Sequence, residues 1–121
     1  MKEYKVKVHN DRTDWYNLED QRHREDGPAV EYADGYKAYY INGKRHREDR
    51  PAIEWADGDK YYYINGKFHR EDGPAIEYAD GSKHYYINDI QITKEEFDNR
   101  NKSCIEKIIE IEGVKYKLSK V

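Results

Sequence analysis

The sequence has a single cysteine, little net charge and no long hydrophobic run. Because Cys104 is alone among 121 residues, no disulfide can form within the chain, and we expect a reducing, cytoplasmic location. The formal net charge of −3 excludes a strong overall attraction for polyanions. Without a signal peptide or an apolar run that could cross a bilayer, no membrane span is expected.

The motifs that identify many enzymes are also missing. The sequence contains no Gly-x-Ser-x-Gly, no phosphate-binding loop and no Cys–His pairing signal. Acidic pairs such as Glu25-Asp26 recur, but adjacent residues on a strand point to opposite faces and basic residues accompany the pairs. We therefore expect no enzymatic activity, no catalytic residue and no cofactor.

Charged residues and tyrosine are abundant. The protein is 39% charged, with a mean hydropathy of −1.28, which alone would be typical of disorder. Aromatic residues, however, make up 14% of the sequence, and thirteen of them are tyrosine. Because tyrosine buries its ring while its hydroxyl stays in water, this composition favours a folded protein without a deep core.

The sequence His-Arg-Glu-Asp occurs three times, beginning at His23, His46 and His69, each 23 residues after the last. The match continues through a Pro-Ala pair, a glutamate, an aromatic residue, an Ala-Asp-Gly triplet and a Tyr-Tyr-Ile-Asn run. In the middle copy Arg50 replaces the glycine found at Gly27 and Gly73, so a left-handed backbone is not expected there. A fixed short period indicates a repeat array.

One repeat is predicted to contain two main strands and tight turns. Residues 52–56 alternate in character and read as a strand, Asp57-Gly58 is a hairpin turn, and residues 60–64 form the second strand. Asn65-Gly66 is another turn signal, followed by a short third run at residues 67–69.

The ends of the array differ from its middle. Residues 4–8 predict a strand, and residues 15–18 imitate the Tyr-Tyr-Ile-Asn run as a half repeat. At the other end Thr93 and Glu96 predict a capping box, with Ile92 and Phe97 as its hydrophobic staple, for a helix ending near Lys102. Residues 104–121 then predict a hairpin turning at residues 112–113.

Over about residues 14–92 the sequence resembles MORN repeats. The resemblance lies in the period of 23 residues and in two motifs, Tyr63-Ile64-Asn65-Gly66-Lys67-Phe68-His69 and the following Ala79-Asp80-Gly81. The sequence departs from them where Arg24-Glu25-Asp26-Gly27-Pro28 follows the histidine and where tyrosine replaces a strand glycine. This His-Arg-x-Asp-Gly-Pro-Ala variant is similar to the MORN-like repeats of large bacteriophages and giant viruses. The resemblance implies a phage-like origin, a location in the host cytoplasm, a binding or scaffolding role and no catalysis.

The expected fold is mostly β: an elongated, twisted antiparallel sheet of repeated β-hairpins with a short C-terminal helix and a terminal hairpin cap. As one domain over 1–121, it would comprise a capping strand (1–13), a half repeat plus three repeats (14–92), the helix (93–103) and the cap (104–121).

The invariant Tyr39/Tyr62/Tyr85 and Ile41/Ile64/Ile87 are predicted to point inward, and Tyr40/Tyr63/Tyr86 outward. Positions that vary between copies fall on the outer face as well. The candidate partner-binding residues are therefore Tyr36, Tyr40, Tyr61, Tyr63, His84 and Tyr86.

The repeated polar residues suggest four further functions, of different weight. Zinc binding is disfavoured, because equivalent residues would lie about 10 Å apart on a sheet with two strands per repeat. We expect structural roles for His23, His46, His69, Asp26, Asp49 and Asp72.

Nucleic-acid binding is disfavoured because acidic residues neutralise the arginines. A small anionic nucleotide held by Arg24, Arg47 and Arg70 with tyrosine rings is the alternative function, and self-association through an open edge or the aromatic face stays open.

The main expectation is a non-enzymatic protein that recognises a host or viral protein through its aromatic sheet face, with inhibition of a host defence system as one such role. Tyrosine is suited to interaction hot spots, and repeat arrays offer extended binding surfaces.

Overall fold

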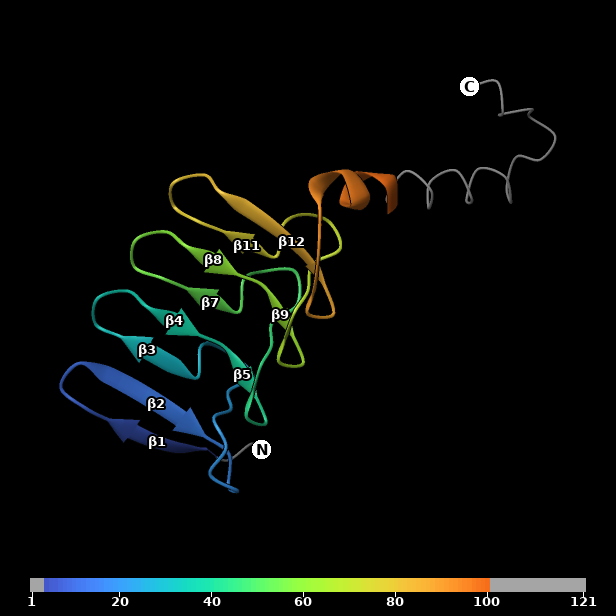
Figure 1. Ribbon diagram of the computed structural model, residues 1–121. Coiled ribbons are helices and arrows are strands. Elements are labelled where there is room, and N and C mark those ends of the chain that lie inside the picture. The colour runs from blue at the N-terminus through green and yellow to red at the C-terminus, as the bar shows by residue number, and fades with distance from the viewer. Residues whose placement is uncertain (1–3, 101–121) are drawn as a thin grey trace, which may run out of the picture. The chain divides into compact units, whose positions relative to one another are not determined.

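A computed structural model describes residues 4–100 of the protein. The protein forms two compact units, Met1–Gln91 and Ile92–Val121. The described residues are mostly β, with antiparallel strands in a large sheet and one short helix, as the sequence predicts (Figure 1). None of their helices has the length and apolar character needed to cross a membrane.

Thirteen strands lie in the described residues, and they are short. In sequence order they are β1 (Lys5–Val8), β2 (Arg12–Tyr16), β3 (Val30–Tyr32), β4 (Lys37–Ala38), β5 (Tyr40–Ile41), β6 (Lys44–Arg45), β7 (Ile53–Glu54), β8 (Lys60–Tyr61), β9 (Tyr63–Ile64), β10 (Lys67–Phe68), β11 (Ile76–Glu77), β12 (Lys83–Ile87) and β13 (Ile90–Ile92). The spacing of 23 residues is kept, since β3, β7 and β11 begin at equivalent positions, as do β4, β8 and β12.

Nine of these strands form one sheet in the order β1-β2-β3-β4-β7-β8-β11-β12-β13. The first hairpin of each repeat (β3–β4, β7–β8 and β11–β12) supplies its centre. The four strands outside this sheet form second hairpins, β5–β6 and β9–β10, which are separate two-stranded sheets. Figure 1 shows the first hairpins stacked in one row and the second hairpins in another.

The predicted strand over residues 60–64 is divided between the two rows. β8 ends at Tyr61 and β9 begins at Tyr63, so the backbone leaves the large sheet and enters a second hairpin. That hairpin turns at Asn65 and Gly66, whose φ angles of 52° and 81° are both positive, as a type I′ turn requires. The short run predicted at residues 67–69 is its returning strand, β10.

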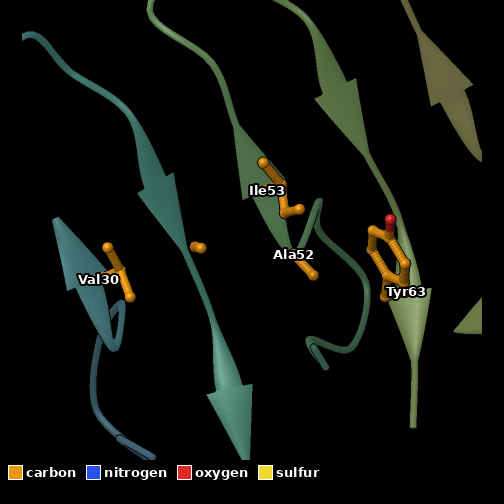
Figure 2. Packing of buried hydrophobic residues seen from close by; sticks show 5 residues of the cluster. Val30, Ala52, Ile53 and Tyr63 are labelled. Carbon is orange, nitrogen blue, oxygen red and sulfur yellow. The ribbon is translucent and has the colours of Figure 1, made fainter. Parts of the chain in front are cut away.

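The core lies between these elements and consists of Val30, Ala38, Ala52, Ile53 and Tyr63 (Figure 2). The predicted outward position of Tyr63 is wrong, because its side chain is only 8% exposed. Residues 61 and 63 do share a sheet side, as alternation requires, but the second hairpin covers that side. The sequence reasoning assumed a face open to solvent.

The ends of the described part agree with the sequence. β1 pairs with β2 in the antiparallel register Val6↔Trp15, which confirms the predicted N-terminal strand. The helix covers residues 94–100. Its capping box is present, because Thr93 Oγ1 accepts the Glu96 N–H at 3.0 Å and Glu96 Oε1 accepts the Thr93 N–H at 2.8 Å. The predicted helix end near Lys102 and the hairpin at residues 104–121 lie outside the described residues.

Candidate binding face

Aromatic and arginine side chains gather on one side of the large sheet, which we call the aromatic-arginine face. Its members come from the hairpin tips, the middle of the sheet and the second hairpins. They are Arg22, Tyr32, Tyr36, Tyr40, Arg45, Trp55, Tyr61, Tyr63, Phe68, Tyr78, His84 and Tyr86.

Edge-to-face ring contacts run across the first hairpins. Tyr36 lies 4.7 Å from Trp55, and Trp55 lies 6.1 Å from Tyr61, between ring centroids. Tyr61 lies 6.2 Å from Tyr78, which in turn lies 5.6 Å from the His84 ring. These separations and steeply inclined planes are the preferred geometry of aromatic pairs, so the rings stabilise one another across three repeats.

A second row follows the second hairpins and mixes rings with guanidinium groups. Arg22 and Arg45 lie 5.9 and 5.8 Å from the centre of the Tyr40 ring, within the range of a cation–π contact. Arg45 also lies 5.4 Å from Tyr63. In the next repeat Phe68 occupies the position of Arg45 and stacks on Tyr63 at 4.4 Å. The row thus changes from cationic to apolar along the sheet.

All six predicted partner-binding residues belong to this face, although Tyr63 is buried within it. The sequence prediction did not include Trp55, Phe68 and Tyr78, which connect the predicted rings. It considered Arg22 and Arg45 only as part of a basic edge that could bind nucleic acid. The repeat could have indicated most of them, because the equivalent positions 32, 55 and 78 are all aromatic and the equivalent positions 22 and 45 are both arginine. Trp55 is the most exposed of the rings on this face, at 42%.

A groove of about 580 Å³ opens on this face beside the first repeat. Arg22, Tyr40 and Arg45 line it from the side of the second hairpins, and Val30, Tyr32, Tyr36, Trp55 and Ala56 from the large sheet. Its residues also include Asp34 and Asp57 at the hairpin tips. The groove therefore combines four aromatic rings with two cations and two anions.

The carboxylates of Asp34 and Asp57 each accept a hydrogen bond within their own hairpin turn. Asp34 Oδ1 accepts the Tyr36 N–H at 3.0 Å, and Asp57 Oδ1 accepts the Asp59 N–H at 3.0 Å. The glycine that follows each aspartate has a positive φ, 109° at Gly35, which explains the repeated Ala-Asp-Gly triplet. The tip positions of both carboxylates are thus fixed by the backbone.

Burial raises the pKa of several tyrosines on this face. It raises the pKa of Tyr61 to about 12, with a hydrogen bond to Tyr78 as the next cause. Burial also raises the pKa of Tyr36 and of Tyr63. These hydroxyls therefore stay protonated at neutral pH and can donate hydrogen bonds, but they supply no base for catalysis.

The three arginines predicted as an anion site lie on the opposite side of the sheet. The guanidinium carbons of Arg24, Arg47 and Arg70 stack on Trp15, Tyr39 and Tyr62 at 3.9, 3.8 and 4.0 Å. Each guanidinium also donates to the carbonyl of the proline four residues on, at 3.1–3.3 Å.

These arginines have acidic partners as well. Arg24 Nε lies 2.8 Å from Asp26 Oδ1, and Arg70 Nε lies 3.0 Å from Asp72 Oδ1. Arg47 instead pairs with Glu54 at 3.4 Å. Because their donors already serve these contacts, the three arginines anchor loops, and the cations better placed for a ligand are Arg22 and Arg45.

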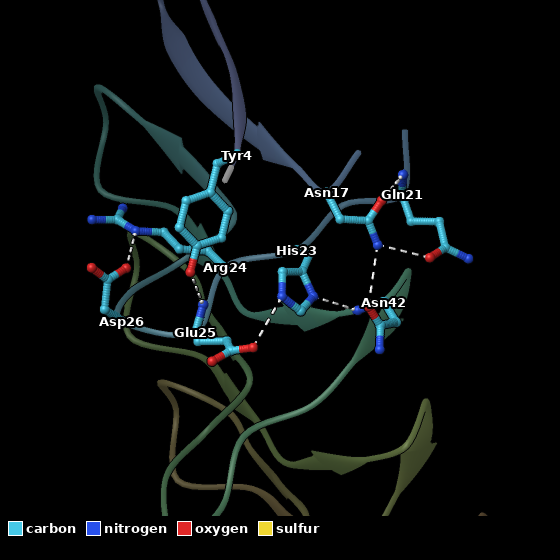
Figure 3. A network of polar contacts seen from close by, with 8 residues as sticks. All are labelled: Tyr4, Asn17, Gln21, His23, Arg24, Glu25, Asp26 and Asn42. Atoms are coloured by element: carbon cyan, nitrogen blue, oxygen red, sulfur yellow. Dashed lines mark hydrogen bonds and ion pairs between the residues drawn. The ribbon is translucent and has the colours of Figure 1, made fainter. Parts of the chain in front are cut away.

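The histidines of the repeated run join one turn to another (Figure 3). His23 Nδ1 accepts the Asn42 N–H at 2.9 Å, and its Nε2 lies 3.4 Å from Glu25. The equivalent bonds join His46 to Asn65 at 2.9 Å and His69 to Asn88 at 3.0 Å. All three histidines therefore bind backbone in the same way.

In the first and third repeats the glycine of this loop leaves room for the arginine. A Cβ at Gly27 or Gly73 would stand 2.8 Å from the guanidinium carbon of Arg24 or Arg70. Neither glycine has a positive φ, which agrees with the sequence prediction. In the middle repeat, where Arg50 replaces glycine, Asp49 has a φ of 69°.

Among residues 4–100, no three histidine, cysteine, aspartate or glutamate side chains are grouped so that they could hold a metal ion. The fold and the site together define an antiparallel sheet of repeated hairpins that carries an aromatic-arginine face. No family model, curated protein or solved structure matches this protein. The resemblance to MORN repeats therefore stays a prediction from the sequence.

Proposed function

We propose that this protein is a non-enzymatic binding protein that recognises a protein partner through the aromatic-arginine face. The observation that carries the proposal is the exposure of Trp55, 42% open to solvent amid the rings of Tyr36 and Tyr61 and beside a groove that Arg45 also lines. Tryptophan, tyrosine and arginine are the residues that most often dominate binding energy at protein interfaces. The sequence resemblance adds the expectation that the partner is a host or viral protein.

A nucleotide remains the alternative ligand, now at Arg22 and Arg45. The groove offers rings for stacking and guanidinium groups for a phosphate. The carboxylates of Asp34 and Asp57 line the same groove, however, and they would repel a phosphate group. A peptide can place a carboxylate against the arginines and backbone N–H donors against the aspartates, which supports a protein partner.

The proposal is tested by affinity capture with two double variants. Trp55→Ala with Arg45→Ala removes two exposed side chains from the face and leaves the buried Tyr63 itself unchanged. Lys44→Ala with Lys60→Ala is the matched control, because these exposed lysines precede Arg45 and Tyr61 on the same strands and point to the other side.

The wild type and the lysine variant should retain the same protein from host or infected-cell lysate, and the Trp55/Arg45 variant should retain at least tenfold less. Circular dichroism must show the same β content for all three proteins. Equal retention by all three, or no retained protein, contradicts the proposal.

A further inference from the structure

The groove opens beside a sheet position whose side chain differs in each repeat. Ala38, Tyr61 and His84 are 23 residues apart and occupy the same register, opposite Val30, Ile53 and Ile76. Tyr61 fills its place with a ring that contacts Trp55, Phe68 and Tyr78. Ala38 has only a methyl group there, and its partner Val30 lines the groove. Val30 therefore faces the groove next to a fully buried Ala38, where the following repeats carry larger side chains.

The wall formed by the second hairpins is cationic. Arg22 and Arg45 both line the groove, and neither forms an ion pair within residues 4–100. Arg22 Nε is buried and has no hydrogen-bond partner among the described residues. A buried donor without a partner costs free energy, so a ligand in the groove would gain most where its acceptor reaches the Arg22 guanidinium.

The wall at the hairpin tips has the opposite charge. Asp34 and Asp57 each use Oδ1 for their own turn, and the other carboxylate oxygen is available to accept a hydrogen bond. A ligand that fits both walls therefore carries an anion on one side and N–H donors on the other. A polyphosphate has no such donors and would meet two carboxylates at the rim.

We infer that this groove binds an acidic peptide segment of the partner. One carboxylate pairs with Arg22 and Arg45, backbone N–H groups donate to Asp34 and Asp57, and an apolar side chain packs on Val30 and Trp55. The carboxylate comes from an Asp or Glu side chain or from the carboxyl terminus of the partner, which present the same chemistry to a guanidinium group. The inference rests on the proposed function, because it names the part of the protein partner that the face receives.

Three short peptides separate these sources: acetyl-Gly-Leu-Glu-Leu-Gly-amide, its Gln analogue, and the Gln analogue with a free carboxyl terminus. Each is titrated into ¹⁵N-labelled full-length protein, and the side-chain signals of Arg22, Arg45 and Trp55 report binding. At least one carboxylate peptide should bind at least tenfold more tightly than the uncharged Gln peptide. Inorganic phosphate is the competitor and should displace the peptide poorly.

Two variants place the peptide in the groove. Arg22→Gln with Arg45→Gln removes the cations, and Ala38→Tyr introduces the side chain that the next repeat already accommodates. Each should weaken binding at least tenfold, whereas Lys44→Gln, on the other side of β6, should leave it unchanged. Two independent variants keep the test valid if Ala38→Tyr alters the fold.

The inference is overturned if no peptide binds, if the Gln peptide binds as well as the others, or if phosphate competes equally. It is also overturned if the double arginine variant binds normally. Failure of the peptides together with partner capture that still depends on Trp55 would remove only this inference. Peptide binding with no captured protein would instead count against the proposed function.

Discussion

Each histidine of the repeated run acts through one ring nitrogen. His23 Nδ1 accepts a hydrogen bond from the backbone N–H of Asn42, which lies 19 residues further along the sequence. Because Asn42 opens a type I′ turn with a φ of 49°, the histidine holds one turn against the next loop. The histidine therefore joins successive parts of the array.

Replacing His23 with alanine should lower the free energy of unfolding by about 2 kcal/mol, because the Asn42 N–H loses its acceptor at a buried site. Denaturant titration followed by circular dichroism measures the change. Glu19→Gln, at an exposed position of the same half repeat, is the control and should change stability by less than about 0.5 kcal/mol. A His23→Ala variant as stable as this control would contradict the role.

The threefold occurrence of histidine in the sequence indicated a structural role but did not identify its partner. The acceptor bond depends on how a second hairpin stacks on the loop before it. The position of Arg22 and Arg45 on the aromatic-arginine face could not be predicted for a related reason. They stand next to the histidines, but their place beside the Tyr40 ring, rather than beside a carboxylate, is decided by packing between distant parts of the sequence.

The loop that links two repeats is an element built around an arginine. Arg70 bonds to Asp72, to the Pro74 carbonyl and to Glu77, and its guanidinium lies over Tyr62. The Arg70 guanidinium occupies this position because Gly73 has no Cβ, which would stand 2.8 Å from its carbon. In the middle repeat, where Arg50 replaces that glycine, Arg47 keeps the proline and glutamate contacts but forms no ion pair with Asp49.

Gly73→Ala should therefore lower the free energy of unfolding by about 1 kcal/mol, since the new Cβ displaces the Arg70 guanidinium from Asp72 and its neighbours. A double-mutant cycle with Arg70→Ala gives the decisive measurement. In the Arg70→Ala background, Gly73→Ala should leave the free energy of unfolding unchanged, or raise it slightly by restricting the unfolded state. Equal costs in both backgrounds would show that Arg70 is not the cause.

At the scale of elements the sequence predicted the turns better than the strands. Asp57-Gly58 and Asn65-Gly66 were recognisable because both turn types need positive φ angles. The division of residues 60–64 between β8 and β9 was not recognisable, because a period of two residues is the same in a straight strand and in one that passes from one sheet to another.

The whole molecule buries much of its aromatic surface on one side, and this makes its stability sensitive to high pH. Burial raises the pKa of Tyr61 from 10.0 to about 12. Since the folded state holds this proton more tightly, the stabilisation is complete below pH 10 and is lost as the pH rises through 12. The raised pKa of Tyr36 and Tyr63 acts in the same direction.

The melting temperature should fall between pH 10 and pH 12, and the fall should be shallower for Tyr61→Phe, which has no hydroxyl to ionise. Thermal unfolding followed by far-ultraviolet circular dichroism at a series of pH values measures both slopes. Identical slopes for the two proteins would show that Tyr61 does not contribute.

The same burial explains the error in the sequence prediction of faces. Alternation correctly placed Tyr61 and Tyr63 on one side, but the side bearing the variable residues was taken as open to solvent. The second hairpins cover it, so it holds both the core and the candidate site. A sheet this thin has no face reserved for packing alone.

Ala38 is interchangeable, in register, with Tyr61 and His84. A point substitution at any of these three positions changes the size of a side chain next to the candidate site without inserting a residue or altering a hydrogen-bonded pair of the ladder. The place of recognition can thus shift along the array, by about 10 Å per repeat, while the backbone stays the same. In the proposed binding role, single-residue changes of this kind would be enough to alter which partner the face accepts.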